Sequence, residues 1–147
     1  MGLNTRVARC ACDQLQVAVS GEPYFIAACH CTQCQRRTGS VFGVSAYFTG
    51  TQVVAVSGES KVFVRSATTS GRPVQFHFCP QCGSTVYWTG VGEDAAEGLG
   101  IAAGCFADRH FPAPQIVAWC VGRVGWVEFP PGIPRHDSQP ESILGLY

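Results

Sequence analysis

Seven of the nine cysteines lie in three short clusters, and they are the residues in this sequence best suited to chemistry. Thiolates are soft ligands that suit zinc better than a hard cation. A closed structural zinc site takes four protein ligands, whereas a catalytic site takes three and leaves one position open. Seven cysteines therefore predict two zinc ions per chain. The clusters are Cys10-Ala11-Cys12, Cys29-His30-Cys31-Thr32-Gln33-Cys34 and Cys79-Pro80-Gln81-Cys82.

The third cluster predicts half of the closed site. A proline lies between Cys79 and Cys82 and a glycine follows them, so the chain can turn and direct both sulfurs to one ion. The remaining two ligands must come from a distant segment. Cys10 and Cys12 are favoured, because alternate residues of an extended strand place their side chains on one face. We predict a structural zinc bound by Cys10, Cys12, Cys79 and Cys82.

The second cluster predicts the open site. Cys29, Cys31 and Cys34 lie within six residues, so their sulfurs can close on one ion and leave a position toward solvent. The alternatives are a two-metal structural cluster of all seven cysteines, or Cys34 as a buried thiol. Three thiolates weaken the Lewis acidity of zinc, which favours capture of a soft sulfur ligand over activation of water. The substrate predicted on this ground is a small thiol.

Other residues that metals or thiols often use are given plainer expected roles. His30 lies between two predicted ligands, but on an extended segment its ring would point away from their face. His77 is expected at an ordinary sheet position, with a hydrogen bond to a ligand sulfur as the alternative. Cys105 and Cys120 are isolated, and cysteine is among the most buried residue types. We expect both to be core thiols.

Two arginines and three aromatic residues follow the second cluster. Arg36 and Arg37 are expected on a solvated helix face, and the alternative is pairing with a substrate carboxylate, which suits the guanidinium fork. Phe42, Tyr47 and Phe48 are expected in the core, with the wall of the open site as the alternative.

The composition describes one domain over residues 1–147. Ten basic and ten acidic residues leave a formal net charge of zero, which argues against a nucleic-acid-binding surface. No apolar run approaches the roughly 18 residues of a membrane span, and the N-terminus lacks the hydrophobic region of a secretion signal. We expect a cytoplasmic protein, in which clustered cysteines bind metal rather than form disulfides.

The local pattern predicts a mainly β fold with little helix. Short runs rich in β-branched and aromatic residues alternate with glycine and proline turns. One short helix is predicted over Thr32–Thr38, with Gly39 at the C-cap position. The tail over 130–147 contains several prolines and is expected to be an irregular strap. The predicted strands are 14–19, 41–48, 53–56, 62–65, 74–78, 85–88, 100–103, 116–119 and 125–128.

The three clusters, in this order and with their flanking residues, resemble the glutathione-dependent formaldehyde-activating enzyme family. The resemblance covers about residues 8–134, and its most specific part is the second cluster followed by Thr38-Gly39. The residues that carry it are Cys10-Ala11-Cys12, Cys29-His30-Cys31-Thr32-Gln33-Cys34-Gln35-Arg36-Arg37-Thr38-Gly39-Ser40, Phe78-Cys79-Pro80-Gln81-Cys82-Gly83-Ser84, Ile101-Ala102-Ala103-Gly104 and Trp126-Val127-Glu128.

The resemblance implies a zinc-stapled, β-tent-like single domain. It implies a structural zinc on Cys10, Cys12, Cys79 and Cys82, and a second zinc on Cys29, Cys31 and Cys34. It also implies a carbon–sulfur lyase that joins glutathione and formaldehyde to give S-hydroxymethylglutathione. Where family members often have a histidine at the start of the late strand, this chain has Gln115.

Two functions remain open on the sequence. The first is a zinc-dependent enzyme that makes or breaks a carbon–sulfur bond in the adduct of a small thiol such as glutathione. The second is a non-catalytic zinc-stapled β domain that binds a protein partner. An open fourth position at the second metal favours the enzyme, whereas a fourth protein ligand such as Cys105 or His30 favours the binding domain.

Overall fold

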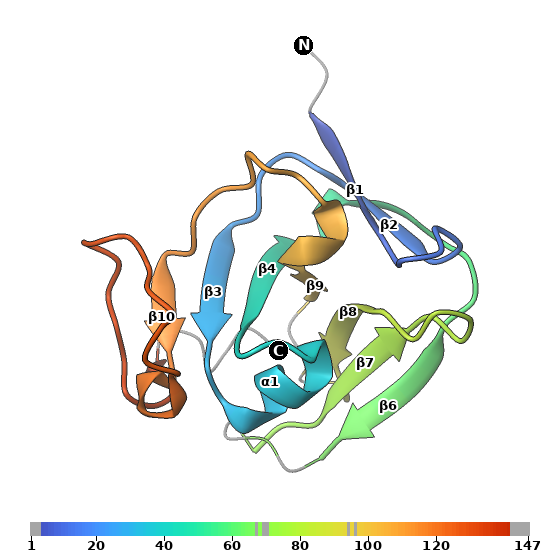
Figure 1. Cartoon of the computed structure of the whole chain (residues 1–147). Coiled ribbons are helices and arrows are strands. Elements are labelled where there is room, and N and C mark those ends of the chain that lie inside the picture. Colours follow the sequence, from blue (N-terminus) through green and yellow to red (C-terminus); the bar gives the residue numbers. More distant parts are fainter. Residues whose placement is uncertain (1–3, 67, 69–70, 94, 96, 142–147) are drawn as a thin grey trace.

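The computed structural model describes residues 4–66, 68, 71–93, 95 and 97–141, and within them the chain is mainly β, as predicted (Figure 1). The single α-helix of these residues, α1, has the predicted bounds. The strands are β1 Thr5–Arg9, β2 Gln16–Ser20, β3 Phe25–Cys29, β4 Gly43–Thr49, β5 Val53–Ser57, β6 Lys61–Arg65, β7 Val74–Phe78, β8 Thr85–Gly90, β9 Gly98–Ala102 and β10 Ile116–Ala118. The helices are α1 Thr32–Thr38 and the 3-10 turns η1 Gly50–Gln52, η2 Ala103–Phe106 and η3 Cys120–Gly122.

The strands form two sheets. The small sheet has the order β1-β2-β5, and the large sheet has the order β10-β3-β4-β9-β8-β7-β6. All neighbouring strands are antiparallel except β10, which runs parallel to β3. Figure 1 shows β10 and β6 at opposite edges of the large sheet, with α1 in front of it.

The main core lies between the two sheets. In β2, the fully buried Val17 and Val19 alternate with half-buried residues, which is the pattern of a strand with one face in the core. Ala8 of β1 joins them from the small sheet. The large sheet contributes apolar side chains from its central strands to the same cluster, namely Ile26, Ala46, Phe48, Val86 and Ile101.

The opposite face of the large sheet carries two smaller apolar clusters. One consists of Ala27, Ile116 and Ala118, and the other of Val74, Phe76 and Trp88. A cross-strand row explains their position, because Tyr47, Gly100, Trp88 and Phe76 are successive partners across β4, β9, β8 and β7. Both faces of the central strands are therefore buried.

Local differences from the sequence prediction have physical reasons. Strands β1 and β3 were not predicted. β3 has no period-two alternation because both of its faces are buried: Ile26 packs in the main core and Ala27 in a smaller cluster on the opposite face. Residues 125–128 were predicted to be a strand but form a turn followed by irregular chain. The segment of the predicted strap that is described, up to residue 141, lies along β10 and bonds to it at Val117 on both sides. Residues 142–147 lie outside the described part.

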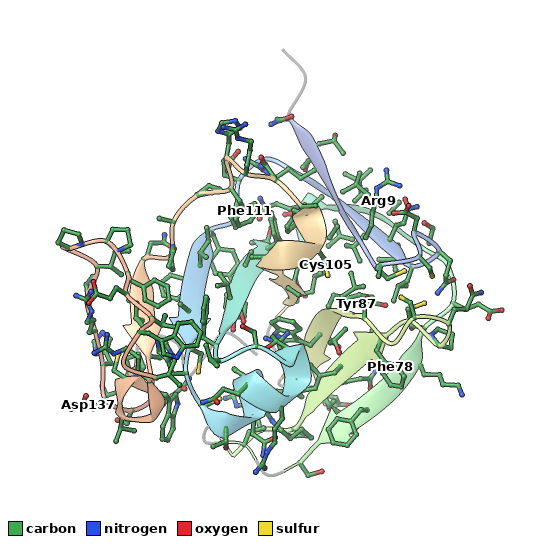
Figure 2. All side chains as sticks on the ribbon, viewed as in Figure 1. Arg9, Phe78, Tyr87, Cys105, Phe111 and Asp137 are labelled. Atoms are coloured by element: carbon green, nitrogen blue, oxygen red, sulfur yellow. The ribbon has the colours of Figure 1, made fainter. Side chains whose placement is uncertain are left out.

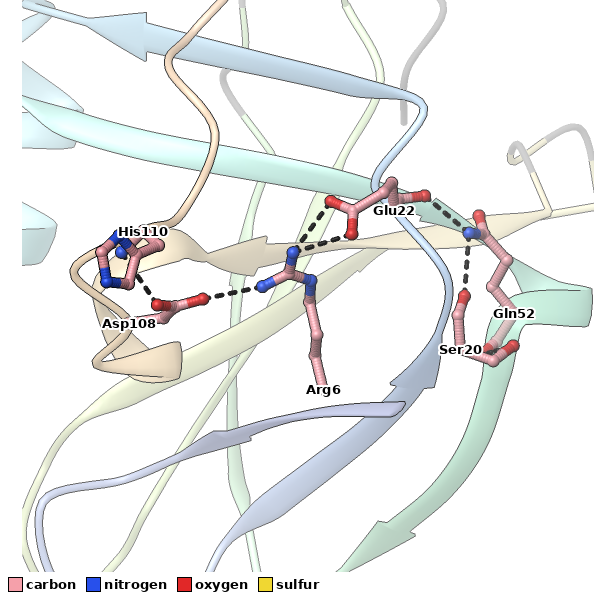
Figure 3. A network of polar contacts seen from close by, with 6 residues as sticks. All are labelled: Arg6, Ser20, Glu22, Gln52, Asp108 and His110. Carbon is pink, nitrogen blue, oxygen red and sulfur yellow. Dashed lines mark hydrogen bonds and ion pairs between the residues drawn. The ribbon is translucent and has the colours of Figure 1, made fainter. Parts of the chain in front are cut away.

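An ion-paired arginine connects the N-terminal hairpin to two later loops (Figure 3). Arg6 of β1 donates to the carboxylate of Glu22 at 2.7 and 2.9 Å and to that of Asp108 at 2.8 Å. Its side chain is only 15% exposed, so solvent screens these pairs less than ordinary surface pairs. Gln52 donates to the backbone oxygens of Ser20 and Glu22, which fixes the turn that carries one carboxylate.

No helix in the described ranges has the length and apolar character needed to span a membrane.

We predict that Gly100→Ala destabilises the fold, because a Cβ there would overlap the indole of Trp88. Trp88 is almost fully buried, and overpacking of such a site costs about 1–3 kcal/mol. Gly104→Ala is the matched control, since an added Cβ at that exposed position meets nothing within 4 Å. Urea unfolding of both variants measures the difference, and equal midpoints would contradict this account of Trp88.

Candidate metal centres and adjoining pocket

The four-cysteine cluster lies where two hairpin turns meet. Cys10 and Cys12 lie in the turn between β1 and β2, while Cys79 and Cys82 lie in the turn between β7 and β8. All four sulfurs lie within 4.8 Å of one another. Figure 2 shows sulfur atoms gathered beside the turn of the β1–β2 hairpin. The cluster thus connects the small sheet to the large one.

The sulfur spacing in this cluster fits a tetrahedral metal site. Cys12 Sγ lies 3.6 Å from both Cys10 Sγ and Cys79 Sγ. A zinc–sulfur bond of about 2.3 Å gives a tetrahedral edge of roughly 3.8 Å. The donor set, four thiols with no other ligand type, also suits zinc. The residues present therefore fit the ion that the sequence predicts.

N–H groups directed at the sulfurs favour the thiolate form. Leu15 N–H donates to Cys10 Sγ at 3.3 Å, and the Gln14 side-chain amide donates to Cys79 Sγ at 3.0 Å. The hydroxyl of Ser84 lies 3.3 Å from Cys82 Sγ, and this contact is the main reason why the pKa of Cys82 is lowered to about 5. Such bonds to the charged form stabilise it.

One local expectation about this cluster is wrong. Cys10 and Cys12 are not on a strand but in a turn that follows β1, and Asp13 completes that turn with a φ of 66°. Their sulfurs meet because the chain reverses. Gln14 holds the turn in place by a pair of hydrogen bonds with the backbone of Glu59, between β5 and β6.

The three-cysteine cluster forms where β3 passes into α1. Cys29 ends β3, Cys31 is the N-cap of α1, and Cys34 lies in the first turn of the helix. Their sulfurs also lie within 4.8 Å of one another. Cys34 N–H donates to Cys31 Sγ at 3.3 Å, so the same bond that caps the helix holds the sulfur. Gly39 ends the helix in the left-handed conformation, as predicted.

A fourth ligand is absent from this cluster among the described residues. Neither His30 nor Cys105 belongs to it. His30 is fully buried, and its ring packs against Phe42 and Phe129 at centroid distances of 5.8 and 5.7 Å. Burial lowers the pKa of His30. The sequence favoured a core or surface role for His30 over metal binding, and the packing places the ring in the core.

Without a cation the three sulfurs do not all ionise. Contacts with Cys31, and then with Cys34, raise the pKa of Cys29. Contacts with Cys29, and then with Cys34, lower the pKa of Cys31 to about 2. The first thiolate is thus stabilised by neighbouring thiol donors, whereas a second meets repulsion and burial. Three thiolates in this space require a positive ion, which is a second sign of fit to a metal.

Arg37 is held beside this cluster by stacking. Its guanidinium lies 4.4 Å from the ring centroid of Trp88. The contact with Cys29 and, to a smaller degree, the charge of Arg37 lower the pKa of Cys34, but the contact with Cys31 and burial outweigh them, so this pKa is raised. A Cβ on Gly43 would lie 2.8 Å from Arg37 Nη2 and 3.4 Å from Cys34 Cβ. Glycine in β4 therefore lets α1 approach the sheet closely. Arg36, on the same helix, is exposed.

A cavity of about 350 Å³ opens next to the three-cysteine cluster. Its floor is the face of the large sheet opposite the main core. All three cysteines line it, together with Arg37 and Tyr47. Its lining also includes Ala27, Arg65, Phe76, Trp88, Trp119, Val121 and Gln139.

The remaining expectations divide between the two faces of the sheet. Tyr47 lines the cavity, whereas Phe48 belongs to the main core. Cys105 is half-buried against that core on η2 (Figure 2), and half-buried Cys120 donates to the Val117 carbonyl at 3.7 Å. His77 occupies a sheet position, stacked on Tyr87 at 4.2 Å.

Trp88, Trp119 and Arg65 are pocket residues that the sequence prediction did not include. The sequence placed Trp88 and Arg65 at the ends of the predicted strands 85–88 and 62–65, and it gave no other sign that they belong to a pocket. Trp119 has a φ of 57°, a conformation that the sequence gives no reason to expect of a tryptophan.

The comparison with protein families agrees with the fold and with the cysteine geometry. The family model described as glutathione-dependent formaldehyde-activating enzyme matches residues 5–122. The match includes all seven clustered cysteines and most of the cavity. Both sulfur groups could hold a metal ion, and the family suggests glutathione-linked activation of formaldehyde. This chain belongs to the glutathione-dependent formaldehyde-activating enzyme family.

Proposed function

We propose that this protein is a zinc-dependent carbon–sulfur lyase acting on the adduct of glutathione and formaldehyde, S-hydroxymethylglutathione, in either direction. The observation that carries the proposal is the three-cysteine cluster, which lacks a fourth ligand among the described residues and lines a cavity. A closed site would have no position for a substrate sulfur.

The two clusters have different proposed roles. Cys10, Cys12, Cys79 and Cys82 hold a structural zinc that joins the two sheets. Cys29, Cys31 and Cys34 hold a second zinc with an open position. When bound there, the zinc supplies a positive charge that favours the thiolate form of a substrate thiol.

The protein groups around the cavity bind the thiol and balance its charge. Three cysteine thiolates and one Zn²⁺ sum to −1, and the guanidinium of Arg37 beside them restores neutrality. Arg37 and Arg65 both line the cavity and present donors that match carboxylates, of which glutathione has two. Addition of the sulfur to the carbonyl carbon forms the carbon–sulfur bond and moves the π electrons to oxygen. The oxygen takes a proton from water, and the thiol proton leaves to solvent, since the ring of His30 is fully buried against Phe42 and Phe129.

A second candidate function is protein binding by a non-catalytic zinc domain. One observation favours it: the edge strand β6 exposes Val62, Phe63 and Val64, with Phe63 60% exposed. Edge strands with such side chains can pair with another chain.

We predict that metal content separates the two clusters. Zinc-replete wild type should contain two zinc ions, and folded Cys34→Ser should contain one. Cys82→Ser should fail to fold, because the energy of structural zinc binding is folding energy. Cys120→Ser is the control and should keep both ions. Elemental analysis with circular dichroism measures this, and an unfolded Cys34→Ser protein would contradict the assignment.

We predict that Arg37→Gln weakens glutathione binding by about tenfold, the effect of losing one charge-assisted hydrogen bond. Arg36→Gln is the matched control, since Arg36 is exposed on the same helix, and its effect should stay below about twofold. Calorimetric titration of zinc-loaded protein measures both affinities. Equal effects of the two variants would contradict the role given to Arg37.

The proposed reaction is tested by the exchange rate between free formaldehyde and S-hydroxymethylglutathione. Magnetisation-transfer NMR should show faster exchange with zinc-loaded wild type than with buffer, and the buffer rate with Cys34→Ser. Cys120→Ser should act like wild type. A wild-type rate equal to that in buffer would contradict the proposed activity on formaldehyde.

A further inference from the structure

The cavity has two chemically different sides, separated by the three-cysteine cluster. Cys29 ends β3 and Cys34 lies on α1 over β4, near the centre of the large sheet. Toward β8, β7 and β6 lie Arg37, Trp88, Phe76 and Arg65, which we call the cationic side. Toward the β10 edge lie Trp119, Val121 and Ala27, which we call the apolar side.

The cationic side holds two arginines without a negatively charged partner among the described residues. Arg37 stacks on Trp88, and Arg65 lies 5.2 Å from the ring centroid of Phe76. The two rings contact each other at 5.6 Å, so both cations are held on one aromatic platform. Arg65 Nε is buried with no hydrogen-bond partner. Both arginines are half-buried and line a cavity, so their guanidinium donors can pair with the carboxylates of a ligand.

The apolar side is formed around Trp119. Trp119 directly follows Ala118, the β10 partner of Cys29, so its side chain lies beside the cysteine cluster. A tryptophan with positive φ is strained, and such strain is concentrated at functional sites. Trp119 Nε1–H donates to Gln139 Oε1 at 3.0 Å, so the described tail segment holds the ring. With its polar atom occupied, the indole offers the cavity an apolar face.

Formaldehyde has no substituent to contact this apolar side. Its two heavy atoms fill a small part of a cavity of about 350 Å³, and the polar groups of glutathione match the cationic side instead. We propose that the electrophile suited to this chain is an aldehyde with a flat apolar substituent, such as an aromatic ring, which packs against Trp119 while the thiol carboxylates bind Arg37 and Arg65. This inference rests on the proposed function and refines its substrate class.

The reaction keeps the same balance as with formaldehyde. The thiol sulfur forms a bond to the aldehyde carbon, the carbon–oxygen π bond breaks, and the oxygen gains one proton while the sulfur loses one. The product is a hemithioacetal with no change of oxidation state. The added substituent changes only what the apolar side of the cavity contacts.

The test compares two stable thioethers that stand in for such adducts. S-benzylglutathione should bind zinc-loaded wild type about tenfold more tightly than S-methylglutathione, as expected for burial of one aromatic ring. Trp119→Ala should remove this preference. Trp126→Ala is the matched control, because Trp126 is 76% exposed and does not line the cavity, and it should retain the preference.

A second variant keeps the test valid if Trp119→Ala does not fold. Val121 is 76% exposed and lines the cavity, so Val121→Asp should fold and should also reduce the preference for the benzyl group. Equal affinities of wild type for the two thioethers would overturn the inference. So would equal losses of preference in Trp119→Ala and Trp126→Ala.

Binding of the thioethers does not depend on catalysis, so the two proposals can fail separately. Accelerated formaldehyde exchange without a benzyl preference would overturn only the inference on substrate class. A benzyl preference with no accelerated exchange of either formaldehyde or benzaldehyde would overturn the proposed enzyme.

Discussion

The close packing of Trp88 across Gly100 is the contact on which the rest of the site depends. Glycine at this position leaves the centre of β9 without a side chain, and the indole occupies that space. The ring also contacts the guanidinium of Arg37, which lies on α1 three residues after Cys34. The cation–π contact is worth more here than at an exposed site, because both partners are partly desolvated.

The two cysteine clusters are built from different kinds of local structure. One short segment places all members of the three-cysteine cluster, because the end of a strand, a helix N-cap and the first helical turn follow one another directly. The four-cysteine cluster needs two turns that are almost 70 residues apart in the sequence, and Gln14 links these two turns to a third turn at Glu59. Loss of the four-cysteine cluster therefore affects the contact between the two sheets. Loss of the three-cysteine cluster does not, because that cluster lies on one face of the large sheet.

The charges of the cysteine sulfurs and of Arg37 relate the three-cysteine cluster to the cavity beside it. Contacts among the three sulfurs raise the pKa of Cys29 and lower that of Cys31, which favours one thiolate in the cluster and disfavours a second. A metal ion would allow the others to ionise, and Arg37 offsets the charge that remains. The same guanidinium faces a cavity in which the described residues supply no carboxylate to pair with it. One arginine can thus stabilise both the cysteine site and a bound anion.

The sequence by itself determined the features that depend on short spacing. The grouping of the cysteines, the helix over Thr32–Thr38 with its glycine cap and most strands follow from period, turn residues and ligand count, because these act within a few residues. Tertiary structure decided which aromatic and basic side chains share the cavity. Trp88, Arg65 and Trp119 come from three separate strands or their ends, and only the strand order places them on one face. The positive φ of Trp119 has no local signal, and the side chain that bonds to its indole, Gln139, lies 20 residues further along the chain.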